Sequence, residues 1–260
     1  MCRPEKEPPK KRFGQHFLID PNTARIVARG VTDNDIVLEV GPGRGALTTV
    51  LAERAKLVHA VELDPDVLPA LHVALKPHRN VLVSEGDALT LDYVSLDPRP
   101  NKFIANLPYN VASPLVLKLL EEADSLSELR FMVQLEVARR MAATRKTKDY
   151  GAYAILVQLL AEVRVEHRVS PNVFDPPPNV WSAVVAMKRR EFPEDYDRAK
   201  KLVLASFKSR RKRLVNNLPG MLREEALDAL RALGYEPAVR AEELRPEDFV
   251  VVSRLLSGVV

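Results

Sequence analysis

The sequence predicts an α/β protein in which a parallel β-sheet with crossover helices is followed by a small, all-helical domain. Short apolar runs alternate with helix-length segments over most of the chain. A glycine-rich turn, EVGPGRG, directly follows the first of these runs. Beyond Arg190 the strand-like runs stop and amphipathic segments replace them.

The predicted strands are too short for helices and rich in Val, Ile and Leu, as expected for parallel strands buried on both faces. Five of them are expected at residues 36–40, 57–61, 81–84, 102–106 and 130–134. Two more candidates follow at 163–169 and 182–188, and the proline-rich stretch SPNVFDPPPNVW between them is expected to be a loop.

Helices are expected at 196–207, at 221–233 with Gly234 closing the helix, and after Pro246. This pattern predicts three parts of the chain. They are a flexible basic arm over residues 1–12, an α/β domain over 13–190 and a helical domain over 191–260.

The composition indicates an ordinary globular protein, with 46% hydrophobic and 28% charged residues in a chain of 260. Cys2 is the only cysteine, which excludes an intramolecular disulfide and fits a cytoplasmic location. No signal-peptide pattern and no membrane-length apolar run is present, so no membrane partner is expected. The five histidines show no metal-ligand spacing, and no metal is expected.

The glycine-rich turn is a weak signal alone, because it is neither a P-loop nor a GxGxxG motif. Polar residues at successive strand ends strengthen it. Glu62 ends the second strand, where a carboxylate can accept both ribose hydroxyls, and Asp87 follows the third, where it can reach an adenine amine. Asn106 ends the fourth strand at the same sheet edge. Since only Arg44 is cationic there, a nucleoside without phosphates is expected.

The tetrapeptide NLPY, residues 106–109, predicts chemistry on an adenine amine, a poor nucleophile because its lone pair is conjugated into the ring. The Asn106 oxygen and a backbone carbonyl beside Pro108 can accept hydrogen bonds from the amine, and Tyr109 can stack on the base. Phe174 is a candidate second stacking residue, although a core position under the proline loop fits it nearly as well.

A cluster of cations suggests a polyanionic partner, in line with a pI of about 9.1. If the preceding helix continues, these residues spread charge around its axis and suit RNA phosphates. They are Lys208, Arg210, Arg211, Lys212 and Arg213. A merely solvated helix end is the alternative, in which case residues 10–12 and 145–148 are the next candidates for RNA contact.

Seven segments between residues 11 and 218 together resemble one family, the small-subunit (16S-type) rRNA adenine N6-dimethyltransferases of the KsgA kind. They are KKRFGQHFL, EVGPGRGALT, VELD, GDAL, NLPYNVASPL, FDPPPNVWSAVV and FKSRRKRLVNNL. The resemblance implies a Rossmann-like class I methyltransferase sheet of seven strands, one of them antiparallel. It also implies a small helical C-terminal domain.

The resemblance further implies S-adenosylmethionine as methyl donor and two adjacent adenosines of a 3′-terminal small-subunit rRNA hairpin as substrate. The products would be N6,N6-dimethyladenosines, made on a pre-ribosomal 30S particle by an enzyme that we expect to be monomeric. The implied donor-site residues are His16, Leu18, Gly41, Gly43, Glu62, Asp87 and Asn106. The implied catalytic and base-holding residues are Asn106, Leu107, Pro108, Tyr109 and Phe174.

Two positions depart from the family pattern. His16 stands where Asn is usual, and an imidazole can still hydrogen-bond the donor. Trp181 replaces a smaller or polar residue, and we expect it in the core rather than on an RNA-stacking surface.

Three other functions compete with this interpretation. A macrolide-resistance methyltransferase acting on large-subunit rRNA would share the donor pocket, but FDPPP and KSRRKRLVNNL favour the small-subunit enzyme. A DNA adenine methyltransferase is disfavoured because no base-sequence recognition domain is visible. A catalytically silent RNA-binding assembly factor is disfavoured by the presence of Glu62, Asp87, Asn106 and Tyr109.

Overall fold

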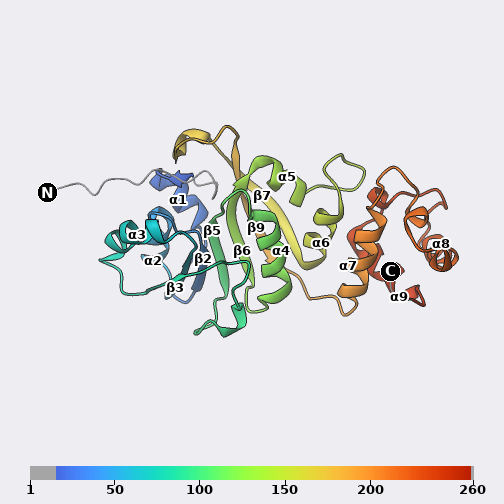
Figure 1. The fold of residues 1–260 in the computed structure, drawn as a ribbon, viewed down its shortest axis with the longest axis horizontal. Helices are drawn as coiled ribbons and strands as arrows, with labels where there is room; N and C mark the ends of the chain where they lie inside the picture. The colour runs from blue at the N-terminus through green and yellow to red at the C-terminus, as the bar shows by residue number, and fades with distance from the viewer. Residues whose placement is uncertain (1–15, 259–260) are drawn as a thin grey trace. The chain divides into compact units, whose positions relative to one another are not determined.

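The computed structural model describes residues 16–258, so the predicted basic arm over 1–12 lies outside the described residues. A seven-stranded sheet with strand order β4-β3-β2-β5-β6-β9-β7 forms the centre of the α/β part (Figure 1). Its strands are β2 (Ile36–Val40), β3 (Leu57–Glu62), β4 (Val81–Glu85), β5 (Lys102–Asn106), β6 (Glu128–Gln134), β7 (Ala161–Val169) and β9 (Ser182–Arg189).

The sheet is mostly parallel, which confirms the predicted fold class. Strand β2 pairs in parallel with β3 and β5, β3 pairs in parallel with β4, and β5 pairs in parallel with β6. Strand β9 runs antiparallel to β6, with Gln134 opposite Ser182. The carboxyl ends of β2, β3, β4, β5 and β6 therefore meet at one edge of the sheet, where ligands bind in open parallel sheets.

Five helices belong wholly or mainly to the α/β part: α1 (Pro21–Val27), α2 (Ala46–Ala52), α3 (Leu68–Leu75), α4 (Ala112–Glu122) and α5 (Leu135–Met141). Helix α1 begins where it does because the Asp20 carboxylate accepts a hydrogen bond from the Thr23 amide at 2.7 Å and a proline follows Asp20. Between residues 16 and 258, no helix is long and apolar enough to cross a membrane.

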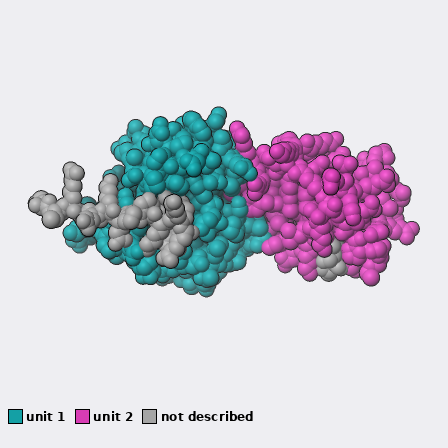
Figure 2. Space-filling model, turned by 45° about the horizontal axis from the view of Figure 1, so that its top comes forward, with its two compact units in different colours: residues 1–138, 164–189 teal, residues 139–163, 190–260 magenta. Residues whose placement is uncertain are grey.

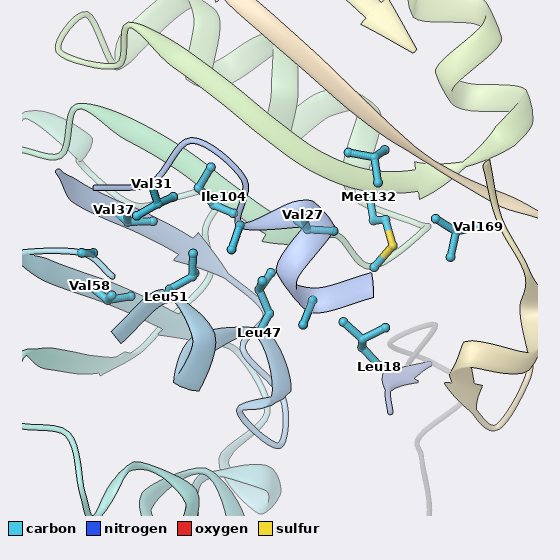
Figure 3. Packing of buried hydrophobic residues seen from close by; sticks show 14 of the residues in the cluster. Leu18, Val27, Val31, Val37, Leu47, Leu51, Val58, Ile104, Met132 and Val169 are labelled. Atoms are coloured by element: carbon cyan, nitrogen blue, oxygen red, sulfur yellow. The ribbon is translucent and has the colours of Figure 1, made fainter. Parts of the chain in front are cut away.

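A core of buried apolar side chains joins α1 and α2 to one face of the sheet (Figure 3). Strands β2, β3, β5 and β6 each contribute one side chain to this core, and side chains of α1 and α2 pack against them. They are Val37, Val58, Ile104 and Met132 from the sheet and Val27, Leu47 and Leu51 from the helices. This core holds α2, and with it the glycine turn that precedes α2, against the carboxyl ends of the strands.

The chain divides into two compact units (Figure 2). Unit 1 comprises residues 1–138 and 164–189, and unit 2 comprises residues 139–163 and 190–260. The second part of unit 2 begins at the predicted boundary near Arg190, but the segment 139–163 groups with it and not with the sheet. Helix α6 (Ala152–Leu160) explains this grouping, since it buries apolar residues on most of its sides and packs against α7 and α9 of unit 2.

The C-terminal helices are α7 (Tyr196–Ser206), α8 (Arg223–Ala232) and α9 (Pro246–Leu255), which confirms the three predicted helices to within two residues where a limit was predicted. The condition considered for the basic cluster, that the first of these helices continues through it, is not met. Helix α7 ends at Ser206, and residues 207–212 form turns. The Asn217 side chain donates to the carbonyls of Ser206 and Ser209 at 2.8 and 3.2 Å, which satisfies carbonyls that a longer helix would use.

The proline-rich stretch contains more regular structure than predicted. Strand β8 (Phe174–Asp175) pairs antiparallel with β1 (Phe17–Leu18), and the prolines follow directly after it. The expectation that Trp181 is a core residue is wrong, because its side chain is 47% exposed.

Candidate active site

A pocket lies in unit 1 at the carboxyl ends of β2, β3 and β5. Every predicted donor-site residue and all four residues of NLPY line it. They are His16, Leu18, Gly41, Gly43, Glu62, Asp87, Asn106, Leu107, Pro108 and Tyr109. The sheet edge thus brings together residues that are up to 93 positions apart in the chain, from His16 to Tyr109.

The glycine turn forms one wall of the pocket through backbone conformations that favour glycine. Gly41 has φ of 71° and Gly43 has φ of 55°. A Cβ atom on Gly43 would stand 3.0 Å from the Phe17 ring, and one on Gly41 would stand 3.4 Å from Pro108. A side chain at Gly43 would therefore crowd the Phe17 ring of β1, and at both positions the positive φ favours glycine.

Glu62 is held rigidly at the end of β3. Its two carboxylate oxygens accept hydrogen bonds from the backbone amides of Gly43 and Asp64, both at 2.9 Å. Burial raises the pKa of Glu62, and these hydrogen bonds oppose the rise. Each oxygen has a second lone pair, so the fixed carboxylate can still accept hydroxyl groups of a ligand.

Glu39 is a pocket residue that the sequence pattern did not single out. Its side chain is 1% exposed, and burial raises its pKa to about 8. Burial therefore favours the neutral, protonated form of this carboxyl. A hydrogen bond with the side chain of the neighbouring Thr48 opposes the rise in pKa. The available signal was an acidic residue inside an otherwise apolar strand, one position before the last residue of β2.

NLPY is anchored to the sheet and to the segment before β1. The Leu107 amide donates to the Met132 carbonyl at 3.1 Å, and the Asn106 side-chain nitrogen donates to the His16 carbonyl at 3.3 Å. The Asn106 nitrogen is thus held by the protein, which makes the Asn106 oxygen the atom that can accept a hydrogen bond from a ligand. Tyr109 shares a 2.6 Å hydrogen bond with the hydroxyl of Ser182.

His16 connects three parts of the site. Its Nδ1 atom donates to the Pro176 carbonyl at 2.7 Å, and its ring centroid lies 5.4 Å from that of Tyr109. His16 therefore fixes the proline-rich loop beside the NLPY tyrosine. Because Nδ1 is occupied, Nε2 is the ring nitrogen that can interact with a ligand.

The two remaining predicted residues of unit 1 differ in their surroundings. Asp87 is exposed at the pocket rim, and its Oδ1 accepts from the Leu89 amide at 2.8 Å. Phe174 is 3% exposed and belongs to the hydrophobic core next to Leu18, and it does not line the pocket. The core position was the alternative that the sequence left open for Phe174, and its stacking role stays a prediction.

The predicted RNA-binding cluster lies in unit 2, where its members have unequal surroundings. Arg210 pairs with Glu242 at 2.5 Å and donates to the carbonyls of Thr147 and Lys148 at 2.8 and 2.5 Å. Arg210 therefore ties the loop 146–148 to the segment at Glu242. The other four members, Lys208, Arg211, Lys212 and Arg213, are at least partly exposed.

Comparison with known proteins identifies relatives along almost the whole chain. A family model described as ribosomal RNA adenine dimethylase matches residues 7–257. The chain is 65% identical over 250 residues to ribosomal RNA small subunit methyltransferase A of Rubrobacter xylanophilus, covering 96% of this chain and 95% of that protein. The protein of the same name from Alcanivorax borkumensis is 38% identical, covering 95% and 89%.

Two solved structures share the architecture. A dimethyladenosine transferase from Plasmodium falciparum has a TM-score of 0.80 and 26% identity, covering 91% of this chain and 96% of that one. The 23S rRNA methyltransferase ErmE has a TM-score of 0.73 and 28% identity, covering 93% and 100%.

Proposed function

The chain belongs to the ribosomal RNA adenine dimethylase family, and we propose that it transfers methyl groups from S-adenosylmethionine to N6 of two adjacent adenosines in the 3′-terminal hairpin of small-subunit rRNA. The observation that carries this proposal is the meeting of Glu62 and NLPY at one pocket. A site for a nucleoside donor and a site for an adenine amine then share one sheet edge.

The residues present fit S-adenosylmethionine. The glycine turn provides a cradle that a Cβ atom would fill, and Glu39 places a buried carboxyl in the lining of the pocket. Glu62 would accept the ribose hydroxyls, and Asp87 would accept from the adenine amine. Arg44 is paired with Asp175 at 3.7 Å, which leaves the pocket better suited to a nucleoside than to a phosphate.

When bound, the donor supplies an electrophilic methyl group on a sulfonium. The chain's own residues prepare the nucleophile. The Asn106 oxygen and a backbone carbonyl of NLPY accept hydrogen bonds from the adenine amine. These hydrogen bonds favour a pyramidal nitrogen with an available lone pair. Tyr109 holds the base by stacking. The proton leaves after transfer, so alignment and electrostatics, rather than a strong base, provide the rate.

Small-subunit rRNA is favoured over large-subunit rRNA as the substrate. The relative that is 65% identical bears a small-subunit name, whereas the likeness to the 23S enzyme ErmE is 28%. We propose that the protein acts in the cytoplasm, as a monomer, on a pre-ribosomal 30S particle, without a metal ion. Lys208, Arg211, Lys212 and Arg213 would contact RNA phosphates, with Arg210 supporting the loop beside them.

The decisive experiment incubates the protein with labelled S-adenosylmethionine and small subunits from cells that lack this modification. We expect label in N6,N6-dimethyladenosine at two adjacent positions near the 3′ end of the rRNA. Asn106→Ala is the matched control, because it should bind subunits and transfer little label. Label confined to large subunits would support the macrolide-resistance activity instead, and binding without transfer by the unaltered protein would support a silent assembly factor.

A further inference from the structure

We propose that Trp181 and Arg168 form a stacking plate for a nucleotide next to the target adenosine. This inference rests on the proposed function, because it presumes an RNA substrate. It assigns a contact to Trp181, which the sequence predicted in the core and which is exposed.

The exposure of Trp181 is the first observation. An indole has a large apolar surface, and a tryptophan with 47% of its surface exposed is incompletely buried by its own chain. Its neighbour Val180 is 44% exposed as well. An exposed aromatic ring beside a second exposed apolar side chain is typical of a contact surface.

The second observation is the cation over one face of the ring, which leaves the opposite face as the one on which a base would stack. The Arg168 guanidinium carbon lies 5.2 Å from the centroid of the Trp181 ring, within the range of a cation–π contact. Arg168 comes from β7 and is exposed. The plate thus combines an aromatic face, which stacks on any nucleobase, with a cation that attracts the phosphate attached to it.

Trp181 and the residue after it are held close to Tyr109 of the pocket. The next residue, Ser182, shares the 2.6 Å hydrogen bond with the Tyr109 hydroxyl, and the Trp181 carbonyl accepts from the Leu135 amide at 2.9 Å. Strand β9 begins at Ser182, opposite Gln134 at the carboxyl end of β6. Trp181 therefore stands at the sheet edge that carries the pocket, one residue from the partner of the base-stacking tyrosine.

This placement identifies the occupant as RNA. A base that leaves its helix to stack on Tyr109 also unstacks its neighbour, and an unstacked base exposes an apolar face. Trp181, the residue before Ser182, offers a ring on which this exposed base face can stack. A purely apolar partner would not use the guanidinium, whereas a nucleotide uses both groups.

Photo-crosslinking tests the contact directly. A benzophenone amino acid replaces Trp181 in the full-length protein, which is bound to undermethylated small subunits and irradiated. The same substitution at Leu82, an exposed apolar residue of β4 at the opposite end of the sheet order, is the control. We expect a crosslink from position 181 to rRNA nucleotides flanking the target adenosines, and none there from position 82. Crosslinks only to a ribosomal protein, to distant rRNA or to a second copy of this chain would overturn the proposal.

Kinetics separate stacking from a structural role. Trp181→Ala should raise KM for small subunits by roughly 5- to 100-fold, the range expected when one base–aromatic stack is removed. Trp181→Phe should restore most of the loss, and the Kd for S-adenosylmethionine should stay unchanged in both variants. Equal KM values for Trp181→Ala and the unaltered protein would overturn the plate and leave the proposed function intact. Absence of methylation by the unaltered protein would instead count against the proposed function, and the crosslink would still report on the plate.

Discussion

The Glu62 carboxylate links the end of β3 to the glycine turn, and the same group is expected to bind the donor ribose. Glu62→Ala should weaken donor binding by about 2–4 kcal/mol, because it removes charge-assisted hydrogen bonds to the ribose. Isothermal titration calorimetry measures this change. Glu62→Gln keeps one acceptor oxygen and should lose less affinity. A folded Glu62→Ala protein with unaltered affinity would show that the donor binds elsewhere.

Glu39 makes stability depend on pH. Its pKa is about 8 in the folded protein, against an ordinary value of 4.5 in the unfolded chain. Below the unfolded value both states are protonated and the full stability is present. As pH rises from there towards 8, the unfolded chain releases the proton and the folded protein keeps it, so the free energy of unfolding decreases.

We therefore expect Glu39→Gln to have a higher Tm than the unaltered protein at about pH 9 and a similar Tm at about pH 5. Differential scanning calorimetry of the two proteins gives the difference, in which the titration of all other groups cancels. A Tm difference that is the same at both pH values would mean that Glu39 does not titrate in this range.

Tyr109 combines a ring that should stack with a hydroxyl that bonds Ser182. Tyr109→Ala should cost about 1–3 kcal/mol in kcat/KM, which is the value of one base stack. Tyr109→Phe should retain much of the activity while losing about 0.5–1.5 kcal/mol of stability with the Ser182 hydrogen bond. Steady-state kinetics and thermal unfolding report the two effects. Equal inactivity of both variants would assign the role to the hydroxyl.

For single residues, the sequence predicted the positions of side chains at strand ends better than the positions of side chains inside strands or loops. Glu62 and Asn106 were found because strand ends converge at a parallel sheet edge. Glu39 was not found, since an acid within an apolar strand gives no sign of which way it faces. Phe174 and Trp181 lie in one loop region with opposite burial, and that burial depends on the pairing of β8 with β1.

At the scale of the element, the position of the basic cluster depends on where helix α7 ends. The first C-terminal helix was predicted to end at residue 207 and ends at Ser206, so the cluster at 208–213 follows the helix, and the Asn217 side chain donates to the carbonyl of the last helical residue. The strands were predictable because a two-sided burial pattern repeats along the chain, whereas the turns that follow α7 depend on the contact of Asn217 with Ser206 and Ser209.

The unequal surroundings of the cluster predict unequal effects of substitution. Replacing Arg211, Lys212 and Arg213 with Gln should flatten the slope of log affinity against log salt by ~0.7–0.9 for each phosphate that is no longer neutralised. Arg210→Gln should instead lower Tm, because it removes the bonds to Glu242 and the loop 146–148. Filter binding over a salt series and thermal unfolding measure these effects. An unchanged salt slope in the triple variant would place the RNA surface elsewhere, with 145–148 as the next candidate.

On the scale of the whole molecule, unit 2 takes a segment from the middle of the chain. A protein ended after Arg189 would keep α6 but lack α7 and α9, which cover its apolar residues. We expect this fragment to aggregate and to bind a dye for exposed hydrophobic surface, whereas a chain ended after Ser257 should behave as the full protein does. Size-exclusion chromatography distinguishes them. A monomeric, cooperatively unfolding fragment of residues 1–189 would show that α6 needs no such cover.

The pairing of β1 with β8 and of β6 with β9 has a consequence for synthesis. Strand β1 contains Phe17 and Leu18, but their partners Phe174 and Asp175 leave the ribosome more than 150 residues later. Strand β6 remains a bare sheet edge until β9 has been translated. At elongation rates of about 5–20 residues per second, the pocket at the sheet edge would lack the pairing of β1 with β8 for roughly ten to thirty seconds. The growing chain therefore exposes the unpaired edge of β6 while residues 135–182 are translated, and we expect chaperones that cover such edges to raise the yield of folded protein.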